Sequence, residues 1–256
     1  MSLLALPALA DNYIWLCADA AGNALVVDPG AAAPVQTALA QRGWCLRAIV
    51  LTHHHADHIG GAAQLADATG APIHAPVDAR IGRADVRVAD GDRIELTGGA
   101  LALDVIAVPG HTMTHLAYVG PGLLFCGDTL FSVGCGRMFE GTPTQMLASL
   151  DRLAALPGTT RLCCGHEYTL ANCAFARSIE PGNAALAARE AAVRELRARG
   201  EPSLPSTLAD EIACNPFLRV EAADVRAAIE RHLGRATNDA IEAFAALRAW
   251  KDGFSG

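Results

Sequence analysis

Apolar residues fall in short runs over the first two thirds of the chain and recur at helical spacing over the last third. Four of these runs have the length and composition of strands: residues 13–17, 24–27, 46–51 and 101–108. The first two are flanked by asparagine, aspartate or glycine, as strands often are. Helical spacing first appears over residues 34–42 and 59–68. The pattern therefore predicts a mixed α/β region.

Beyond residue 169 the strand signals stop. Five segments there combine good helix formers with helical spacing, separated by glycine and proline: residues 170–179, 184–199, 206–213, 222–232 and 239–250. We therefore expect an α/β domain over residues 1–169, followed by an all-helical domain over residues 170–256.

Composition narrows the classes of protein. About half of the 256 residues are apolar, and the net charge of −7 includes no block of like charges. Nucleic-acid binding needs clustered Lys and Arg, so we expect no nucleic-acid partner. No uncharged stretch reaches the ~20 residues of a membrane span, so we expect no membrane partner.

Two further features concern location and assembly. The eight cysteines show no paired spacing, which is typical of reduced thiols in the cytoplasm. The N-terminal stretch has no basic segment, and Pro7 interrupts its apolar run, so we expect mature sequence and not a secretory signal. The chemistry considered below demands no more than a monomer, and we expect a cytoplasmic monomer.

A histidine cluster follows the strand expected over residues 46–51. His53 and His55 are two residues apart, so in an extended segment they point the same way, and His54 points the other way. Asp57 and His58 come where the chain turns toward a helix. An affinity tag would be terminal and uninterrupted, whereas this tract is internal. Four candidate ligands within six positions predict a metal site, and imidazole with carboxylate suits zinc or iron better than calcium or magnesium.

Three later strands, expected over residues 101–108, 123–126 and 160–164, end in the same manner. They are followed by His111, Asp128 and His166, each directly after a glycine. Taken singly, such a residue is more often structural than functional. One context that recurs four times is hard to explain by core packing, and it predicts that these side chains join the histidine cluster.

The spacing His-x-His-x-Asp-His, with the later His111, Asp128 and His166, resembles the metallo-β-lactamase superfamily. Other motifs resemble one family within it, the hydroxyacylglutathione hydrolases or glyoxalase II enzymes: residues 11–13, 52–61, 109–112, 125–131, 134–137, 140–142 and 164–169. The resemblance runs from Asp11 to Lys251. It implies an αββα sandwich followed by a small helical domain.

The resemblance also implies the ligands of two divalent transition-metal ions, zinc first, with iron and manganese as alternatives. The first site takes His53, His55 and His111. The second takes Asp57, His58 and His166, and Asp128 bridges the two ions. The residues expected to take part in the chemistry are Asp57, His58 and Asp128.

The implied reaction is hydrolysis of S-D-lactoylglutathione to D-lactate and glutathione, the second step of methylglyoxal detoxification. A hydroxide shared by two cations would attack the thioester carbonyl. By the resemblance, four residues contact glutathione: Arg137, Tyr168, Arg248 and Lys251. Arg137 replaces a lysine of some members and Phe139 a tyrosine. The alternative for Arg248 and Lys251 is a solvated helix face.

Three other functions compete with this hypothesis. A mononuclear iron oxygenase acting on glutathione persulfide would share similar motifs, but the helical tail disfavours it. A β-lactamase or nuclease is disfavoured by Asp128, where several β-lactamases have cysteine, and by the acidic surface. A non-catalytic, metal-dependent binding protein is disfavoured by the complete ligand set.

Overall fold

The computed structural model describes residues 1–95 and 101–254, and the chain divides into two compact units. The first unit comprises Met1–Ala107, Thr114–Gly127 and Cys163–His166. The second comprises Val108–Met113, Asp128–Leu162 and Glu167–Gly256. Because the chain passes between the units several times, consecutive residues such as Gly127 and Asp128 can belong to different units.

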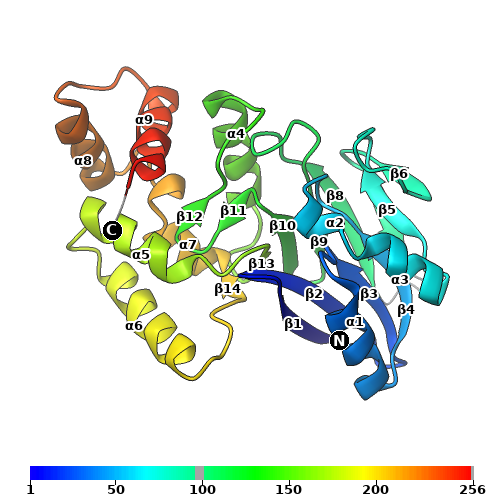
Figure 1. Cartoon of the computed structure of the whole chain (residues 1–256). Coiled ribbons are helices and arrows are strands. Elements are labelled where there is room, and N and C mark those ends of the chain that lie inside the picture. Colours follow the sequence, from blue (N-terminus) through cyan, green and yellow to red (C-terminus); the bar gives the residue numbers. More distant parts are fainter. Residues whose placement is uncertain (96–100, 255–256) are drawn as a thin grey trace. The chain divides into compact units, whose positions relative to one another are not determined.

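The first unit contains a six-stranded sheet in the order β1 to β6. Its strands are β1 (Ser2–Ala8), β2 (Asn12–Ala18), β3 (Asn23–Val27), β4 (Cys45–Val50), β5 (Ile73–Pro76) and β6 (Val86–Val88). The first three strands are antiparallel and the pairs from β3 to β6 are parallel. Parallel strands need crossover connections, which α1 (Ala32–Arg42) and α3 (Ala62–Thr69) supply (Figure 1).

The inner strand β2 is buried along its whole length, so both faces of the sheet must be covered there. On one face, Ile14 and Leu16 pack in a core with Val35 of α1 and Leu65 of α3. On the other face, the indole Nε1 of Trp15 donates a hydrogen bond to the Cys164 carbonyl at 2.9 Å. Helices therefore cover one face of this sheet, and a second sheet lies against the other.

The second sheet has the order β14-β13-β10-β9-β8-β7. Its strands are β7 (Arg93–Glu95), β8 (Ala102–Ala107), β9 (Leu116–Gly120), β10 (Leu123–Gly127), β13 (Arg161–Cys164) and β14 (Ser206–Thr207). In the first unit, the Tyr118 hydroxyl on β9 donates to the Leu51 carbonyl at 2.7 Å, just after β4. This bond ties the second sheet to the segment that leads into the histidine cluster.

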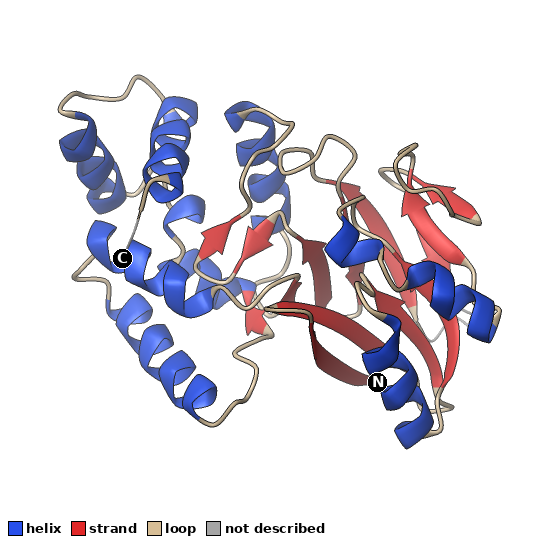
Figure 2. Ribbon diagram, viewed as in Figure 1, coloured by secondary structure: helices blue, strands red, loops and turns tan. Residues whose placement is uncertain are grey.

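Helices predominate in the second unit (Figure 2). They are α4 (Pro143–Ala154), α5 (Thr169–Ile179), α6 (Ala184–Ala198), α7 (Leu208–Cys214), the 3-10 turn η1 (Pro216–Leu218), α8 (Ala223–Leu233) and α9 (Ala240–Asp252). A two-stranded sheet of β11 (Leu130–Phe131) and β12 (Gly134–Cys135) accompanies them. Among the helices described, none is long and apolar enough to cross a membrane.

Two sequence predictions need correction. The helix expected over residues 206–213 begins as strand β14, so the region beyond residue 169 is not entirely helical. Ser206 pairs with Leu162 of β13, and a two-residue pairing carries no hydrophobic period that a sequence could reveal. The helix expected over residues 59–68 is broken at Gly60 and Gly61 into α2 (Ala56–Ile59) and α3.

The cysteines agree with the expectation of reduced thiols, because none of the eight, all of which lie among the described residues, forms a disulfide, and only Cys45 is exposed. Burial raises the pKa of Cys135 to about 11 and that of Cys173 to about 12. Since the thiolate is the reactive form, these buried thiols are doubly protected from reagents.

We therefore expect a thiol-specific disulfide reagent at pH 8 to modify one cysteine rapidly in the native protein and eight after denaturation. The Cys45→Ser variant should show no rapid phase. Two or more rapidly reacting thiols in the native protein would contradict the burial described for this core.

Candidate metal centre

The histidine cluster lies in the first unit, in the loop between β4 and α2. His53 is fully buried, and its ring centroid lies 4.6 Å from that of His55. His54 departs from this pair, with its Nδ1 3.6 Å from Asp78 Oδ2. The expectation that His54 differs from its two neighbours is confirmed.

Gly30 allows the loop after β3 to pass directly against α2. A side chain at this position would collide with the backbone carbonyl of Asp57. The same close passage lets Gly61 N–H donate to the Pro29 carbonyl at 2.7 Å. Glycine at position 30 therefore fixes the backbone from which Asp57 and His58 project.

Asp57, His58 and His166 form one ligand group within the first unit. The Nε2 atoms of His58 and His166 each lie 3.4 Å from Asp57 Oδ2, although His166 comes from the end of β13. One donor atom from each of the three lies within 4.8 Å of the others, which is a spacing that one ion can bridge. The imidazoles of His166 and His58 hold the pKa of the Asp57 carboxyl well below its usual range.

The buried carboxylate of Asp28 orients two histidines of the cluster, His58 and His53, through hydrogen bonds that end at their Nδ1 atoms. Asp28 Oδ2 accepts hydrogen bonds from His58 Nδ1 at 2.9 Å and from the Thr52 hydroxyl at 2.6 Å. His53 Nδ1 donates in turn to that hydroxyl at 3.0 Å. Because both Nδ1 atoms carry the proton, Nε2 of each ring presents its lone pair toward the ligand group.

Two further polar residues support the group in the same way. His166 Nδ1 donates to Asp11 Oδ1 at 2.8 Å, which leaves its Nε2 toward Asp57. Asn12 Nδ2 donates to Asp57 Oδ2 at 2.9 Å. The residue pair 11–12 carries the resemblance to the family, and the structure adds a physical role for each member.

Sequence reasoning missed Asp28 and His115. Asp28 has a positive φ of 51°, which aspartate tolerates better than most residues, and the turn Asp-Pro-Gly was its only signal. His115 is fully buried and stacks on His53, with ring centroids 4.6 Å apart and an interplanar angle of 17°. Its position four residues after His111 in a short loop gave no pattern.

The second unit contains His111 and Asp128, both buried. His111 Nε2 lies 3.6 Å from Asp128 Oδ2, and His111 Nδ1 donates to the Arg137 carbonyl at 2.7 Å. A side chain at Gly136 would collide with the Asp128 carbonyl, so glycine is needed for this approach. A hydrogen bond at Nδ1 thus orients His111, as similar bonds orient His58 and His166 in the first unit.

Three of the four expected glutathione contacts gather at the end of α9, in the second unit. Asp252 Oδ1 accepts from Arg137 Nε at 3.2 Å and from Arg248 Nη2 at 2.9 Å. The Arg248 side chain is only 7% exposed, and its Nη1 donates to the Cys135 carbonyl at 2.8 Å. The alternative that Arg248 belongs to a solvated helix face is therefore wrong.

Lys251 occupies a partly apolar position beside this group. Its Nζ lies 5.1 Å from the Phe175 ring centroid and donates to the Ala171 carbonyl at 3.3 Å. Burial, assisted by the Arg248 guanidinium, lowers the pKa of the Lys251 ammonium. A solvated face does not describe this residue either.

Tyr168 and Phe139, the two aromatic residues considered for the glutathione site, are exposed side chains of the second unit. Tyr168 is 37% exposed, packs against Phe131 with centroids 5.2 Å apart, and precedes Ala171 by three residues. Phe139 is 61% exposed and lies edge-on to His111 at 5.3 Å. Phe139 thus offers an apolar ring beside a candidate ligand.

The donor set fits divalent transition-metal ions. Imidazole nitrogen and carboxylate oxygen are the ligands that zinc, iron and manganese share. In each unit the histidine Nδ1 atoms bond to carboxylate, hydroxyl or carbonyl oxygens, the arrangement in which Nε2 serves as a metal ligand.

Comparison with known proteins agrees with this geometry. Residues 9–166 match the sequence model of the metallo-beta-lactamase superfamily, and residues 167–254 match that of the hydroxyacylglutathione hydrolase C-terminus. A hydroxyacylglutathione hydrolase of Cupriavidus taiwanensis is 56% identical over 97% of both chains. This chain belongs to the hydroxyacylglutathione hydrolase family. Relatives of the same name in Xanthomonas campestris and Pseudomonas fluorescens are each 51% identical over 99% of this chain and over 99% and 100% of their own.

Solved structures share the fold of this family member. The structure of ETHE1 from Myxococcus xanthus superposes with a TM-score of 0.66 and 25% identity, covering 98% of this chain and 100% of its own. The B3 metallo-beta-lactamase BLEG-1 superposes with the same TM-score over 85% of this chain and 99% of its own, at 22% identity. The expected fold class, the metallo-β-lactamase sandwich with a C-terminal helical region, is confirmed.

Replacing the buried carboxylate behind the histidines should weaken metal binding by this hydrolase-family chain. In Asp28→Asn the side-chain volume is kept, but a charged acceptor for His58 and Thr52 is lost. We expect zinc affinity to fall by about 10- to 100-fold, measured by competition with a chelator of known affinity. The control is Asp67→Asn, which breaks only an exposed pair with Arg83 and should bind zinc like the parent. Equal affinity for Asp28→Asn and the parent would contradict the orienting role.

Proposed function

We propose that this protein hydrolyses S-(2-hydroxyacyl)glutathione, with S-D-lactoylglutathione giving D-lactate and glutathione in the second step of methylglyoxal detoxification. One observation carries the proposal: Asp57, His58 and His166 converge in a chain whose C-terminal part matches the hydroxyacylglutathione hydrolase model. Relatives at 51–56% identity over nearly the whole chain bear the name of that activity.

The proposed centre has two sites. His53, His55 and His111 would hold one ion, Asp57, His58 and His166 would hold the other, and Asp128 would be a ligand of both.

Zinc is the metal we propose, with iron or manganese as alternatives, because all three accept nitrogen and oxygen ligands. A solved relative at 30% identity, TTHA1623, is described in a di-iron-bound form and covers 65% of this chain. When bound, such ions lower the pKa of a water molecule and draw charge from a carbonyl oxygen.

The side chains of this protein supply the remaining functions. Asp57 would orient the attacking water relative to the carbonyl carbon and exchange protons with it, while also serving as a metal ligand. The leaving thiol of glutathione ordinarily has a pKa of about 8.5–9, so its departure needs little help from a general acid.

Cations of the second unit would bind glutathione. Glutathione carries two carboxylates, and we assign them to Arg137, Arg248 and Lys251, with Tyr168 as a hydroxyl donor. Asp252 holds the two guanidiniums in place and competes with the incoming carboxylate for them. In this proposal residues 1–169 form the catalytic domain and residues 170–256 contribute to the glutathione site.

The competing functions are less well supported. The match of residues 167–254 to the hydrolase C-terminus favours a glutathione thioester over a persulfide or a β-lactam as substrate. We further propose that the protein acts as a cytoplasmic monomer without nucleic-acid or membrane partners.

Asp57→Asn separates catalysis from binding and tests the proposal. The amide can still occupy the ligand position but cannot take up a proton. We expect kcat for S-D-lactoylglutathione to fall by about 10²- to 10⁴-fold while glutathione binds with unchanged affinity. Zinc content, measured on the same sample, must remain that of the parent. A zinc-loaded parent protein that folds normally and leaves the thioester intact would remove the proposed function.

Arg248→Ala should affect binding instead of chemistry. Loss of a buried cation that meets a substrate carboxylate should raise KM by about tenfold or more with little change in kcat. The exposed Arg161→Ala serves as the control and should leave both constants unchanged. Steady-state kinetics on the two variants decide the matter, and an unchanged KM for Arg248→Ala would exclude its proposed role.

A further inference from the structure

A buried carboxylate in the second unit, Glu211 of α7, holds the turn between β11 and β12. Its Oε1 accepts from the hydroxyls of Ser132 and Ser206 at 2.7 and 2.6 Å. Its Oε2 accepts from the Val133 N–H at 2.7 Å. The side chain is completely buried, so these bonds replace all of its contacts with water.

The turn needs such support, because Val133 has a φ of 59°, a conformation that a β-branched residue rarely adopts. Strain of this kind persists only where the surroundings impose it. Glu211 fixes the Val133 N–H from one side. Asn215 completes the clamp, since its Nδ2 donates to the carbonyls of Phe131 and Gly134, one on each strand.

The carboxylate satisfies buried donors that an apolar side chain could not. Burial raises the pKa of Glu211, while its hydrogen bonds and the charge of Arg189 act in the opposite direction. Arg189 Nη2 also donates to the Ser132 hydroxyl at 3.1 Å. An apolar side chain at position 211 would leave the Val133 N–H and the two serine hydroxyls without this acceptor, so the carboxylate fixes the shape of the turn.

The same hairpin supports Arg248 at its other end. Cys135, the last residue of β12, accepts a hydrogen bond from Arg248 Nη1 at 2.8 Å through its carbonyl. The Phe217 ring lies 5.1 Å from the guanidinium carbon and restricts it further. The register of the hairpin thus sets where the guanidinium lies.

We propose that Glu211 is a positioning residue for glutathione binding, acting through the β11–β12 hairpin on the guanidinium of Arg248. This inference rests on the proposed function, in which Arg248 meets a glutathione carboxylate. Glu211 touches neither substrate nor metal ligand in this scheme, and its effect is transmitted by the Cys135 carbonyl.

The test begins with Glu211→Gln, whose amide offers one acceptor atom where the carboxylate offers two. We expect the Kd of the zinc-loaded protein for glutathione, measured by calorimetry, to rise about tenfold. KM for S-D-lactoylglutathione should rise in parallel, with kcat within about threefold of the parent. Ser132→Ala removes one of the bonds and should raise the Kd by about threefold, so it decides the same point if Glu211→Gln does not fold.

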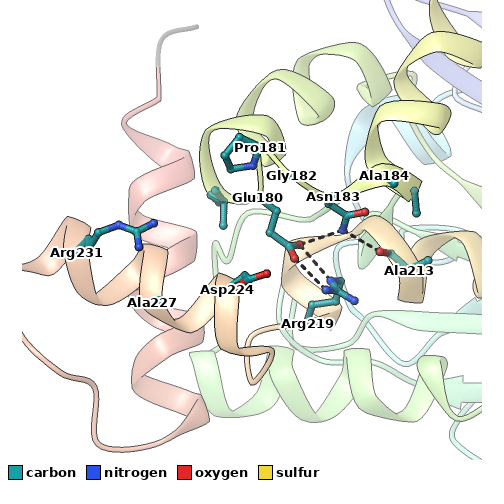
Figure 3. A pocket seen from close by; sticks show the side chains of 12 residues that line it. Glu180, Pro181, Gly182, Asn183, Ala184, Ala213, Arg219, Asp224, Ala227 and Arg231 are labelled. Carbon is teal, nitrogen blue, oxygen red and sulfur yellow. Dashed lines mark hydrogen bonds and ion pairs between the residues drawn. The ribbon is translucent and has the colours of Figure 1, made fainter.

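Glu180→Gln is a matched control, because Glu180 is another buried carboxylate of the same unit. It pairs with Arg219 at 2.9 Å, beside a cavity of about 620 Å³ (Figure 3). Asn183 also donates to Glu180 there, at 3.4 Å. This variant should lower Tm without changing the Kd for glutathione, since its contacts do not reach the hairpin.

A double-mutant cycle shows whether Arg248 carries the effect. In an Arg248→Ala background, Glu211→Gln should leave the Kd for glutathione unchanged. A Kd that rises equally in both backgrounds, or a Glu211→Gln variant that only lowers Tm as Glu180→Gln does, would overturn the inference. If Arg248→Ala itself binds glutathione like the parent, the substrate assignment fails first, and the positioning role falls with it.

Discussion

The hydrogen bonds behind the histidine rings are the constraint on which the candidate centre depends. An imidazole binds a metal only through a nitrogen without a proton, so the proton must be held on the other nitrogen. Asp28 does this for His58 directly and for His53 through Thr52, and Asp11 does it for His166. Lone pairs and the ionised Asp57 therefore face one another, an arrangement that a divalent cation satisfies.

In the second unit, backbone carbonyls accept the hydrogen bonds that orient candidate site residues, whereas carboxylates accept them in the first unit. The Arg137 carbonyl orients His111, and the Cys135 carbonyl orients Arg248. Both carbonyls belong to the β12 strand or the residues just beyond it. The hairpin and the residues just beyond it thus orient a candidate metal ligand and a candidate substrate cation, and buried polar groups clamp the turn of this hairpin.

Local patterns in the sequence predicted a mixed α/β region followed by helices, and they also predicted the ligand candidates. The αββα sandwich was implied by the resemblance to the family. Strands ended in His or Asp beside glycine, and the alternation of an extended segment separated His54 from His53 and His55. The residues behind the ligands were not predictable in the same way. Asp11 and His166 lie 155 positions apart, and no period or spacing links them.

Strand β14 and Glu211 escaped prediction for a similar reason. A two-residue pairing and a buried carboxylate gain their stability from partners brought close by the fold, so neighbouring residues carry no signal of them. The helix predicted from local propensity over residues 206–213 forms only from Leu208 onward.

Anomalous diffraction from crystals of the zinc-loaded protein tests the central claim most directly. The account predicts two anomalous peaks, one bound by His53, His55 and His111 and the other by Asp57, His58 and His166, with Asp128 contacting both ions. A single peak, or two peaks with Asp128 directed away from them, would contradict it.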